Sequence, residues 1–320
     1  MKDPLIVRGC LFLSLIVVVF MPITDGAARP RGHSDATAKH ARPTDPSLYV
    51  GSEVCKTCHE DMPSKGFFKS YENSPHFVTT LDTRKGPEWH GCEGCHGPGK
   101  AHVEGGGDKS KIFVFKEASA AEISATCLDC HAGGTEHAHA LNSVHSQNGV
   151  SCIACHSPHH AQTKEFLLIK PQPELFYTCH LAKKAEFAMP FHHRVDEGLI
   201  QCSDCHNVHG SALPKQVRMA STQDAICFKC HTDKQGPFVY EHATIKVDGC
   251  VSCHRVHGGP NPHMLKLSNV NLLCLQCHTT SSFSSAPGAP SFHNQASFFQ
   301  ACTLCHFAIH GSNFSSFFFK

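Results

Sequence analysis

Residues 202–210 read Cys-Ser-Asp-Cys-His-Asn-Val-His-Gly, and residues 250–258 read Cys-Val-Ser-Cys-His-Arg-Val-His-Gly. In each stretch, two cysteines three positions apart are followed at once by a histidine. This Cys-x-x-Cys-His pattern is the attachment signal for c-type haem. The two thiols add to the haem vinyl groups, and the adjacent imidazole binds the iron. A further histidine follows three residues later, so each stretch supplies one more imidazole than its own attachment needs.

The full pattern occurs nine times in the chain. The predicted thioether cysteines are Cys55, Cys58, Cys92, Cys95, Cys127, Cys130, Cys152, Cys155, Cys202, Cys205, Cys227, Cys230, Cys250, Cys253, Cys274, Cys277, Cys302 and Cys305. The predicted proximal iron ligands are His59, His96, His131, His156, His206, His231, His254, His278 and His306. A single Cys-x-x-Cys pair could equally be half of a zinc site or a redox dithiol. Histidine makes up only 28 of 320 residues, and neither a zinc ribbon nor a disulfide scaffold needs a histidine after every pair. The pattern therefore predicts a multihaem cytochrome c.

A tenth site departs from the pattern. Residues 176–180 read Phe-Tyr-Thr-Cys-His, so Phe176 stands where the first cysteine is expected. Cys179 can still form one thioether, and His180 can still bind iron as the proximal ligand. We therefore expect ten haems, the fifth along the chain held by a single thioether, and nine haems if this site is empty. Of the 20 cysteines, only Cys10, near the N-terminus, lies outside the sites.

Additional histidines follow the sites in a repeat that holds two haems. A lone histidine comes 11 to 17 residues after the histidine of each odd-numbered site, and a close-following histidine comes three to six residues after that of each even-numbered site. The lone histidines are His76, His145, His193, His242 and His293, with His192 as an open alternative to His193. The close-following histidines are His102, His159, His209, His257 and His310. These ten are the predicted distal ligands. A close-following histidine cannot easily reach the opposite face of its own haem, so we expect it to bind a different one.

Seven histidines lie outside this scheme: His33, His40, His90, His137, His139, His160 and His263. The first two fall in a polar segment and are expected to be solvated. Each of the other five is an alternative to an assigned distal ligand. With an imidazole on both faces of every iron, no coordination position stays open, which favours electron transfer over catalysis.

The N-terminus resembles a secretory signal over residues 1–28. Lys2 and Arg8 precede the apolar segment Leu11–Phe20, and small residues at 24–28 suit cleavage. Ten apolar residues are few for a membrane span, although an uncleaved anchor remains the alternative. Cys10 does not indicate a lipoprotein, because it precedes the apolar segment. Export agrees with the expected place of haem attachment. Residues 29–48, rich in Ala, Pro and Arg, predict a flexible leader.

The predicted fold is mostly irregular, with short α-helices, little or no β-sheet and a core filled by haem. Helix-forming residues lead into the haem motifs at 118–130, 222–231 and 268–278. No stretch alternates well enough to predict a substantial sheet. A weak boundary near residues 181–190 divides the chain into two pentahaem halves, residues 49–185 and 186–320. The formal net charge of +1 gives no sign of nucleic-acid binding.

Several stretches resemble the DmsE/MtrA family of periplasmic decahaem cytochromes. They are Gly-Ser-Glu-Val-Cys-Lys-Thr-Cys-His-Glu at 51–60, Asn-Ser-Pro-His at 73–76, Cys-His-Gly-Pro-Gly at 95–99 and Cys-His-Phe-Ala-Ile-His-Gly-Ser-Asn at 305–313. The resemblance covers residues 49–320, and Phe176 departs from it. It implies an elongated protein with haems stacked as a wire. It also implies a periplasmic location, redox partner proteins and, in many members, insertion into an outer-membrane β-barrel that leads to an extracellular cytochrome.

The predicted function is therefore electron transfer along bis-histidine haems, from periplasmic donors to or across the outer membrane, as in anaerobic respiration with external acceptors. Two alternatives stay open: an oxidoreductase that reduces a small nitrogen or sulfur oxyanion at an open haem, and a soluble periplasmic electron shuttle. The apolar C-terminal stretch 314–320, Phe-Ser-Ser-Phe-Phe-Phe-Lys, either docks in a barrel partner or packs on the last haem.

Overall fold

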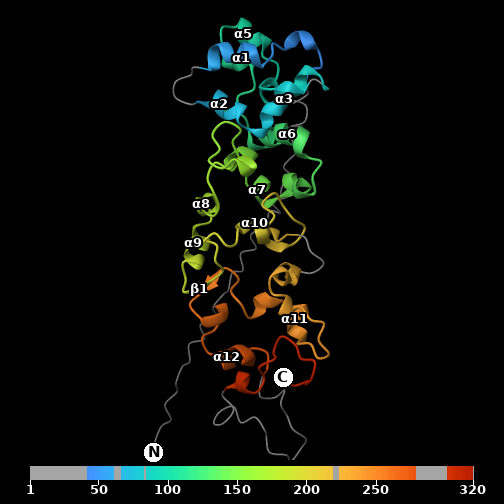
Figure 1. Cartoon of the computed structure of the whole chain (residues 1–320), viewed down its shortest axis with the longest axis vertical. Helices are drawn as coiled ribbons and strands as arrows, with labels where there is room; N and C mark the ends of the chain where they lie inside the picture. Colours follow the sequence, from blue (N-terminus) through green and yellow to red (C-terminus); the bar gives the residue numbers. More distant parts are fainter. Residues whose placement is uncertain (1–41, 61–65, 83, 219–222, 279–300, 320) are drawn as a thin grey trace, which may run out of the picture. The chain divides into compact units, whose positions relative to one another are not determined.

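The computed structural model describes residues 42–60, 66–82, 84–218, 223–278 and 301–319. The predicted signal peptide, Cys10, most of the predicted leader and His293 lie outside these residues. Within them, the chain forms short helices joined by long loops, which can be followed in Figure 1. The α-helices are α1 (Ser52–His59), α2 (Phe67–Glu72), α3 (Val78–Leu81), α4 (Glu93–His96), α5 (Lys100–Glu104), α6 (Ala120–His131), α7 (Val144–Gln147), α8 (Glu174–Tyr177), α9 (Leu181–Phe187), α10 (Cys202–Cys205), α11 (Ala243–Val247) and α12 (Val270–Leu275).

Single turns of 3-10 helix occupy much of the remaining described chain. They are η2 (Pro46–Leu48), η3 (Pro75–Phe77), η4 (Pro87–Trp89), η5 (Lys109–Lys111), η6 (Thr135–His137), η7 (Ala140–Asn142), η8 (Cys152–Ala154), η9 (Glu165–Leu167), η10 (Pro214–Gln216), η11 (Gln223–Lys229), η12 (Thr232–Lys234), η13 (Cys250–Ser252), η14 (Pro262–Met264) and η16 (Cys302–Leu304).

Helix α6 illustrates why the longer helices form where they do. Ser119 accepts a hydrogen bond from the backbone N–H of Glu122, and the Glu122 side chain accepts one from the backbone N–H of Ser119. This capping box satisfies two donors at the helix start. The alanine-rich sequence then continues as helix into the third haem motif. The helix expected at 118–130 is thus confirmed, and α12 lies within the one expected at 268–278. Residues 223–229, by contrast, form the 3-10 helix η11.

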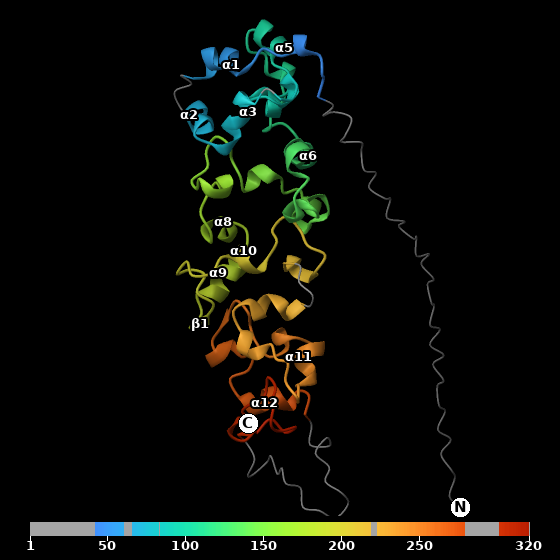
Figure 2. The ribbon, with the colours of Figure 1, turned by 45° about the vertical axis from the view of Figure 1, so that its right-hand side comes forward.

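Regular β-structure is limited to one short pair in the described residues. Strands β1 (Phe191–His192) and β2 (Gly258–Gly259) are antiparallel, with His192 opposite Gly258. Figure 2 shows β1 from a second direction. The expectation of a mostly irregular chain with little sheet is confirmed.

Few apolar side chains are buried by other protein atoms. In the described part of the chain they are Phe68, Tyr71, Ile123, Leu167, Leu175, Phe187, Val195 and Leu273. Many large apolar side chains near the motifs remain accessible, such as Leu304 at 80% and Val78 at 62% exposure. The described residues nevertheless belong to one compact unit. This distribution agrees with a fold whose interior is not made of side chains alone.

Candidate functional site: paired histidines at the haem motifs

Each haem motif forms one helical turn. The backbone N–H of the proximal histidine donates to the carbonyl of the first motif residue, at 2.9 Å for His96 to Cys92 and 3.0 Å for His206 to Cys202. In a helical turn, residues i, i+3 and i+4 lie on the same side. The turn therefore presents both thiols and the imidazole in one direction, as attachment to a single porphyrin requires.

The structure brings predicted proximal and distal histidines together in nine pairs. The distances between ring centres are 6.4 Å for His59–His102, 6.4 Å for His96–His159, 5.9 Å for His76–His131, 6.0 Å for His156–His209, 6.1 Å for His145–His180, 6.1 Å for His206–His257, 6.2 Å for His193–His231, 6.3 Å for His254–His310 and 6.0 Å for His242–His278. These pairs belong to sites one to nine in the order His59, His96, His131, His156, His180, His206, His231, His254 and His278. The remaining predicted distal ligand, His293, lies outside the described residues.

These separations fit an iron atom between the two rings. A nitrogen ligand lies about 2 Å from its metal, and the centre of an imidazole lies roughly 1 Å behind that nitrogen, so two axial imidazoles on one iron have centres about 6 Å apart. The nine measured separations span 5.9 to 6.4 Å. The residues present therefore suit bis-histidine haem.

The pairing connects different parts of the chain. From site four onward, the close-following histidine of an even-numbered site lies opposite the proximal histidine of the preceding even-numbered site, as His209 does to His156 and His257 to His206. His102, from site two, instead lies opposite His59 of site one. Each of the four lone histidines that the structure describes lies opposite the next odd-numbered site, as His145 does to His180. No described close-following histidine is paired within its own site.

The degenerate site five has the same geometry as the others. The backbone N–H of His180 donates to the carbonyl of Phe176 at 2.9 Å, as it does to a cysteine elsewhere. His145 and His180 are separated by 6.1 Å. Cys179 is exposed and carries no disulfide. Replacing the first cysteine by Phe176 has therefore changed neither the motif turn nor the spacing of the two imidazoles.

His192 and His193 have different surroundings. The ring of His193 faces His231, and its Nδ1 contacts the carbonyl of Val256 at 2.6 Å. His145 makes the equivalent contact to the carbonyl of Val208 at 2.9 Å. His192 instead contacts the carbonyl of Met189 and Glu197 Oε1. The geometry favours His193 at site seven.

The proximal histidines of several even-numbered sites contact a main-chain carbonyl through Nδ1. The acceptors are Phe113 for His96, Phe166 for His156, Lys215 for His206, His263 for His254 and Phe317 for His306. Three of these carbonyls belong to residues with positive φ: Phe166 at 56°, Lys215 at 57° and His263 at 55°. Sequence reasoning missed these groups, because main-chain acceptors leave no signature of residue type. Such contacts fix the ring orientation and leave Nε2 for the metal.

Burial keeps the paired imidazoles in the form that can bind iron. It lowers the pKa of His59, His76, His96, His180, His242, His257 and His310, and that of His209 to about 4. A histidine with a lowered pKa is neutral at pH 7. Only the neutral ring has a free lone pair for a metal.

The first cysteines of neighbouring sites lie against each other. Hydrogen bonds join the thiols of Cys55 and Cys92, Cys127 and Cys152, Cys227 and Cys250, and Cys274 and Cys302. Each pair joins an odd-numbered site to the next even-numbered one. At sites five and six, Phe176 takes the place of the first thiol, and burial raises the pKa of the Cys202 thiol to about 11.

The surplus histidines have other contacts. His137 lies 4.3 Å from His209 and 5.9 Å from His131, between ring centres. His160 lies beside His159 at 6.3 Å. The carbonyl oxygen of His263 contacts Nδ1 of His254. His137 is thus the surplus histidine nearest to an assigned distal ligand among those with described ring contacts.

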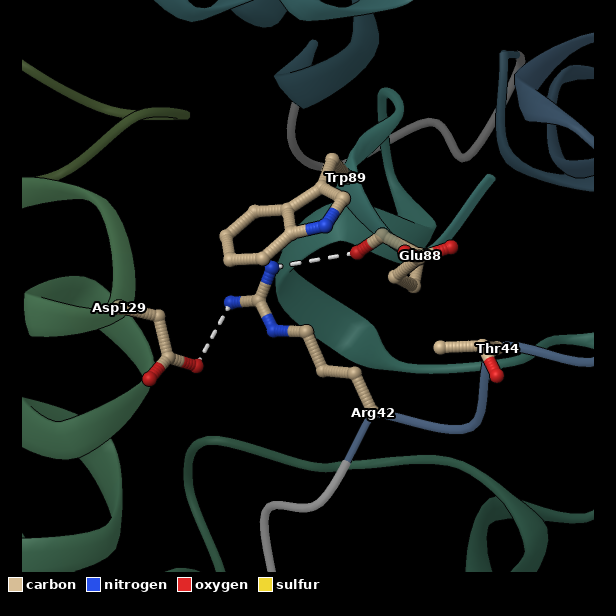
Figure 3. Close-up of a pocket in the computed structure, with 5 residues that line it drawn as sticks. All are labelled: Arg42, Thr44, Glu88, Trp89 and Asp129. Atoms are coloured by element: carbon tan, nitrogen blue, oxygen red, sulfur yellow. Dashed lines mark hydrogen bonds and ion pairs between the residues drawn. The ribbon is translucent and has the colours of Figure 1, made fainter. Parts of the chain in front are cut away.

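The end of the predicted leader is attached to η4, which precedes the second haem motif, and to the third haem motif. The Arg42 guanidinium lies 4.5 Å from the Trp89 ring centre and 3.0 Å from Asp129, and it donates to the carbonyl of Glu88 (Figure 3). Thr44 completes the lining of this shallow pocket. The residues from Arg42 onward therefore make specific contacts.

The C-terminal stretch contacts two of the predicted axial histidines. The Phe319 ring lies 5.1 Å from His306 and the Phe318 ring 5.5 Å from His242. Phe314 is 80% exposed and Phe317 65%. Part of this stretch packs at the haem sites and part remains accessible.

In the described chain, no helix is both long enough and apolar enough to cross a bilayer.

Comparisons with known proteins agree with this site. The family model of the doubled CXXCH motif matches residues 145–185, 192–236 and 242–283. The chain is 31% identical over 278 residues to the multiheme cytochrome MtrA of Shewanella baltica (strain OS185), covering 83% of this chain and 80% of that protein. It is 30% identical over 130 residues to the cytochrome c-type protein NrfB of Escherichia coli O6:H1, covering 35% of this chain and 66% of that protein.

Proposed function

Because the chain belongs to the MtrA family of multihaem c-type cytochromes, we propose that it carries electrons along a series of bis-histidine haems between periplasmic donors and an outer-membrane acceptor. The observation that carries this proposal is the set of nine histidine pairs whose ring centres lie 5.9 to 6.4 Å apart. A haem iron with two imidazole ligands changes oxidation state with little rearrangement. The chain's part is to hold both imidazoles neutral and correctly oriented.

Contacts between thiols support close approach of neighbouring haems. Each thioether cysteine marks the edge of its porphyrin. The contacts Cys55–Cys92 and Cys127–Cys152 therefore bring the edges of two haems together within a repeat. Electron transfer favours short separations between edges, so each repeat is suited to act as a pair. The pairing of histidines from different repeats then links successive pairs.

We also propose that site five holds a haem through Cys179 alone. The thiol adds across one vinyl group: the sulfur forms a bond to one vinyl carbon, and the thiol hydrogen goes to the other. No oxidant is needed, and the second vinyl group stays intact beside Phe176. The His145–His180 separation of 6.1 Å supports a haem here and a total of ten.

The proposed location is the periplasm, with redox proteins as partners. Insertion into an outer-membrane barrel and delivery to an extracellular cytochrome are part of the same proposal, carried by the likeness to MtrA. The accessible Phe314 and Phe317 offer an apolar contact surface at the C-terminus. Co-purification of an outer-membrane protein with a tagged chain supports the conduit, and a tagged chain that returns alone supports the shuttle.

Low-temperature electron paramagnetic resonance of the oxidised protein tests the ligation. The ring planes are crossed by 58° to 72° at sites three, five and seven, and by 17° to 35° at the other six described pairs. Parallel imidazoles split the iron d orbitals more strongly than crossed ones, so two classes of low-spin signal are expected. A high-spin signal that changes with nitrite would instead support the oxyanion reductase.

A further inference from the structure

Sites four and six have nearly the same immediate surroundings. Both proximal histidines, His156 and His206, contact the carbonyl of a positive-φ residue nine or ten positions later in the chain. Both distal histidines, His209 and His257, come from the same place in the repeat. The two sites therefore allow a comparison in which the contacts of the proximal imidazoles match and the surroundings of the distal imidazoles differ.

The distal imidazoles differ in the partner of Nδ1. The Nδ1 of His209 is buried, and no described residue forms a hydrogen bond with it. The Nδ1 of His257 lies 2.8 Å from Glu186 Oε2, across 71 residues of chain. The other oxygen of Glu186 receives the Lys183 ammonium at 2.6 Å. Site six thus has a carboxylate in hydrogen-bond contact with Nδ1 of its distal ligand, whereas no described residue makes this contact at site four.

The fold builds this contact through the backbone. Helix α9 carries Glu186, and the β1–β2 pair fixes the segment of His257 beside it. A Cβ at Gly258 would lie only 2.1 Å from the carbonyl oxygen of Glu186, so a glycine is needed for this approach. The Phe187 ring also packs on His257, with ring centres 5.3 Å apart. The carboxylate is therefore held by packing on both sides of the contact.

A carboxylate in this position changes the electron density of the imidazole. When Nδ1–H donates to an anion, Nε2 becomes more basic and a stronger donor to the metal. A stronger donor stabilises the ferric more than the ferrous iron, which lowers the reduction potential. Lys183 offsets part of the negative charge.

We propose that Glu186 is a positioning residue that lowers the reduction potential of site six relative to site four. The proposal rests on bis-histidine haem at both sites. Site six is the first complete site after the junction of the two pentahaem halves. A low reduction potential at site six makes electron transfer onto this haem energetically uphill in the middle of the series. The carboxylate of Glu186 then sets the rate at which electrons pass through site six.

The test is a spectroelectrochemical titration of the full-length holoprotein with Glu186→Gln. The amide keeps the shape of the side chain and removes its charge. One haem equivalent is expected to move to a more positive potential, with the preference for the ferric form about tenfold weaker, which is about 59 mV for a one-electron couple. Lys183→Met should move the same component the opposite way, because it leaves the carboxylate uncompensated.

Glu197→Gln is the matched control. Glu197 contacts His192, which is not among the paired histidines, at 3.2 Å. This variant should leave every potential unchanged. The proposal is overturned if Glu186→Gln moves no component, or if Glu186→Gln and Lys183→Met move it in the same direction, as a loss of structure would. The spin state of the unaltered protein is recorded first. A high-spin haem at site six would contradict the proposed bis-histidine ligation, and not the role of Glu186.

Discussion

His192 and His193 are adjacent in the chain, yet only one of them faces a predicted proximal histidine. His193 faces His231 across 6.2 Å, whereas His192 contacts the carbonyl of Met189 and Glu197. In extended backbone, successive side chains point in opposite directions. One of two neighbouring histidines can therefore reach a given haem, and the other turns away from it.

Removal of His193 should open site seven. The variant His193→Ala is expected to give one high-spin ferric haem in electron paramagnetic resonance, because no second imidazole then faces His231. The matched variant His192→Ala should keep all signals low-spin. If the high-spin signal arises with His192→Ala instead, the assignment of the two histidines is reversed.

Phe176 and Cys179 set the number of covalent bonds at site five. Cys179→Ala is expected to lower the mass of the denatured protein by one haem, because no other thiol lies in that motif. Phe176→Cys should leave the mass of bound haem unchanged and remove the absorbance of one vinyl-substituted haem from the pyridine haemochrome spectrum. An unchanged mass in Cys179→Ala would mean that site five holds no covalent haem in the natural chain.

At the scale of elements, the turns η9, η10 and η14 recur in successive even-numbered sites. In η10, Lys215 and Gln216 have φ of 57° and 54°, and Asn207 N–H donates to the carbonyl of Gln216 at 2.8 Å. The positive φ directs the carbonyl of Lys215 toward His206. These turns achieve with non-glycine residues what glycine usually provides, so their conformation must be maintained by the contacts they make.

Substitution of Lys215 tests this turn. Lys215→Val should lower the free energy of unfolding by about 1–2 kcal/mol, because a β-branched residue disfavours positive φ. Lys215→Gly should have little effect, since glycine adopts this φ without strain but adds entropy to the unfolded chain. Thermal unfolding of the holoproteins followed by circular dichroism measures both. Equal losses for valine and glycine would point to the lysine side chain instead of the backbone.

At the scale of the whole molecule, the pairing crosses the boundary expected near residues 181–190. His209 of the second half faces His156 of the first, and Arg218 forms an ion pair with Glu136 at 2.8 Å. Gly210 approaches the carbonyl of His139 so closely that a Cβ there would lie 2.6 Å away. The two pentahaem halves thus remain a proposal about sequence repeats, and the residues that join them lie within one structural unit.

The whole fold should depend on haem. Few apolar side chains in the described part of the chain are buried by protein alone, so the hydrophobic stabilisation that they supply is small for its length. Chemical cleavage of the thioethers is expected to abolish helical circular dichroism and to make the chain sensitive to limited proteolysis. The holoprotein carried through the same treatment without the cleaving reagent is the control. Retained protease resistance after haem removal would show a self-sufficient protein core.

The linear spacing of residues was enough to identify the haem motifs, to predict the proximal histidines and to anticipate how little sheet the described residues contain. Two thiols and an imidazole within five residues must act on one porphyrin, so local geometry defines that chemistry. The partner of each imidazole comes from up to 63 residues away, as with His96 and His159. Main-chain acceptors, the thiol contacts between sites and the carboxylate of Glu186 arise only when distant loops pack together. No local pattern specifies these contacts, because they depend on how the loops pack rather than on the order of residues.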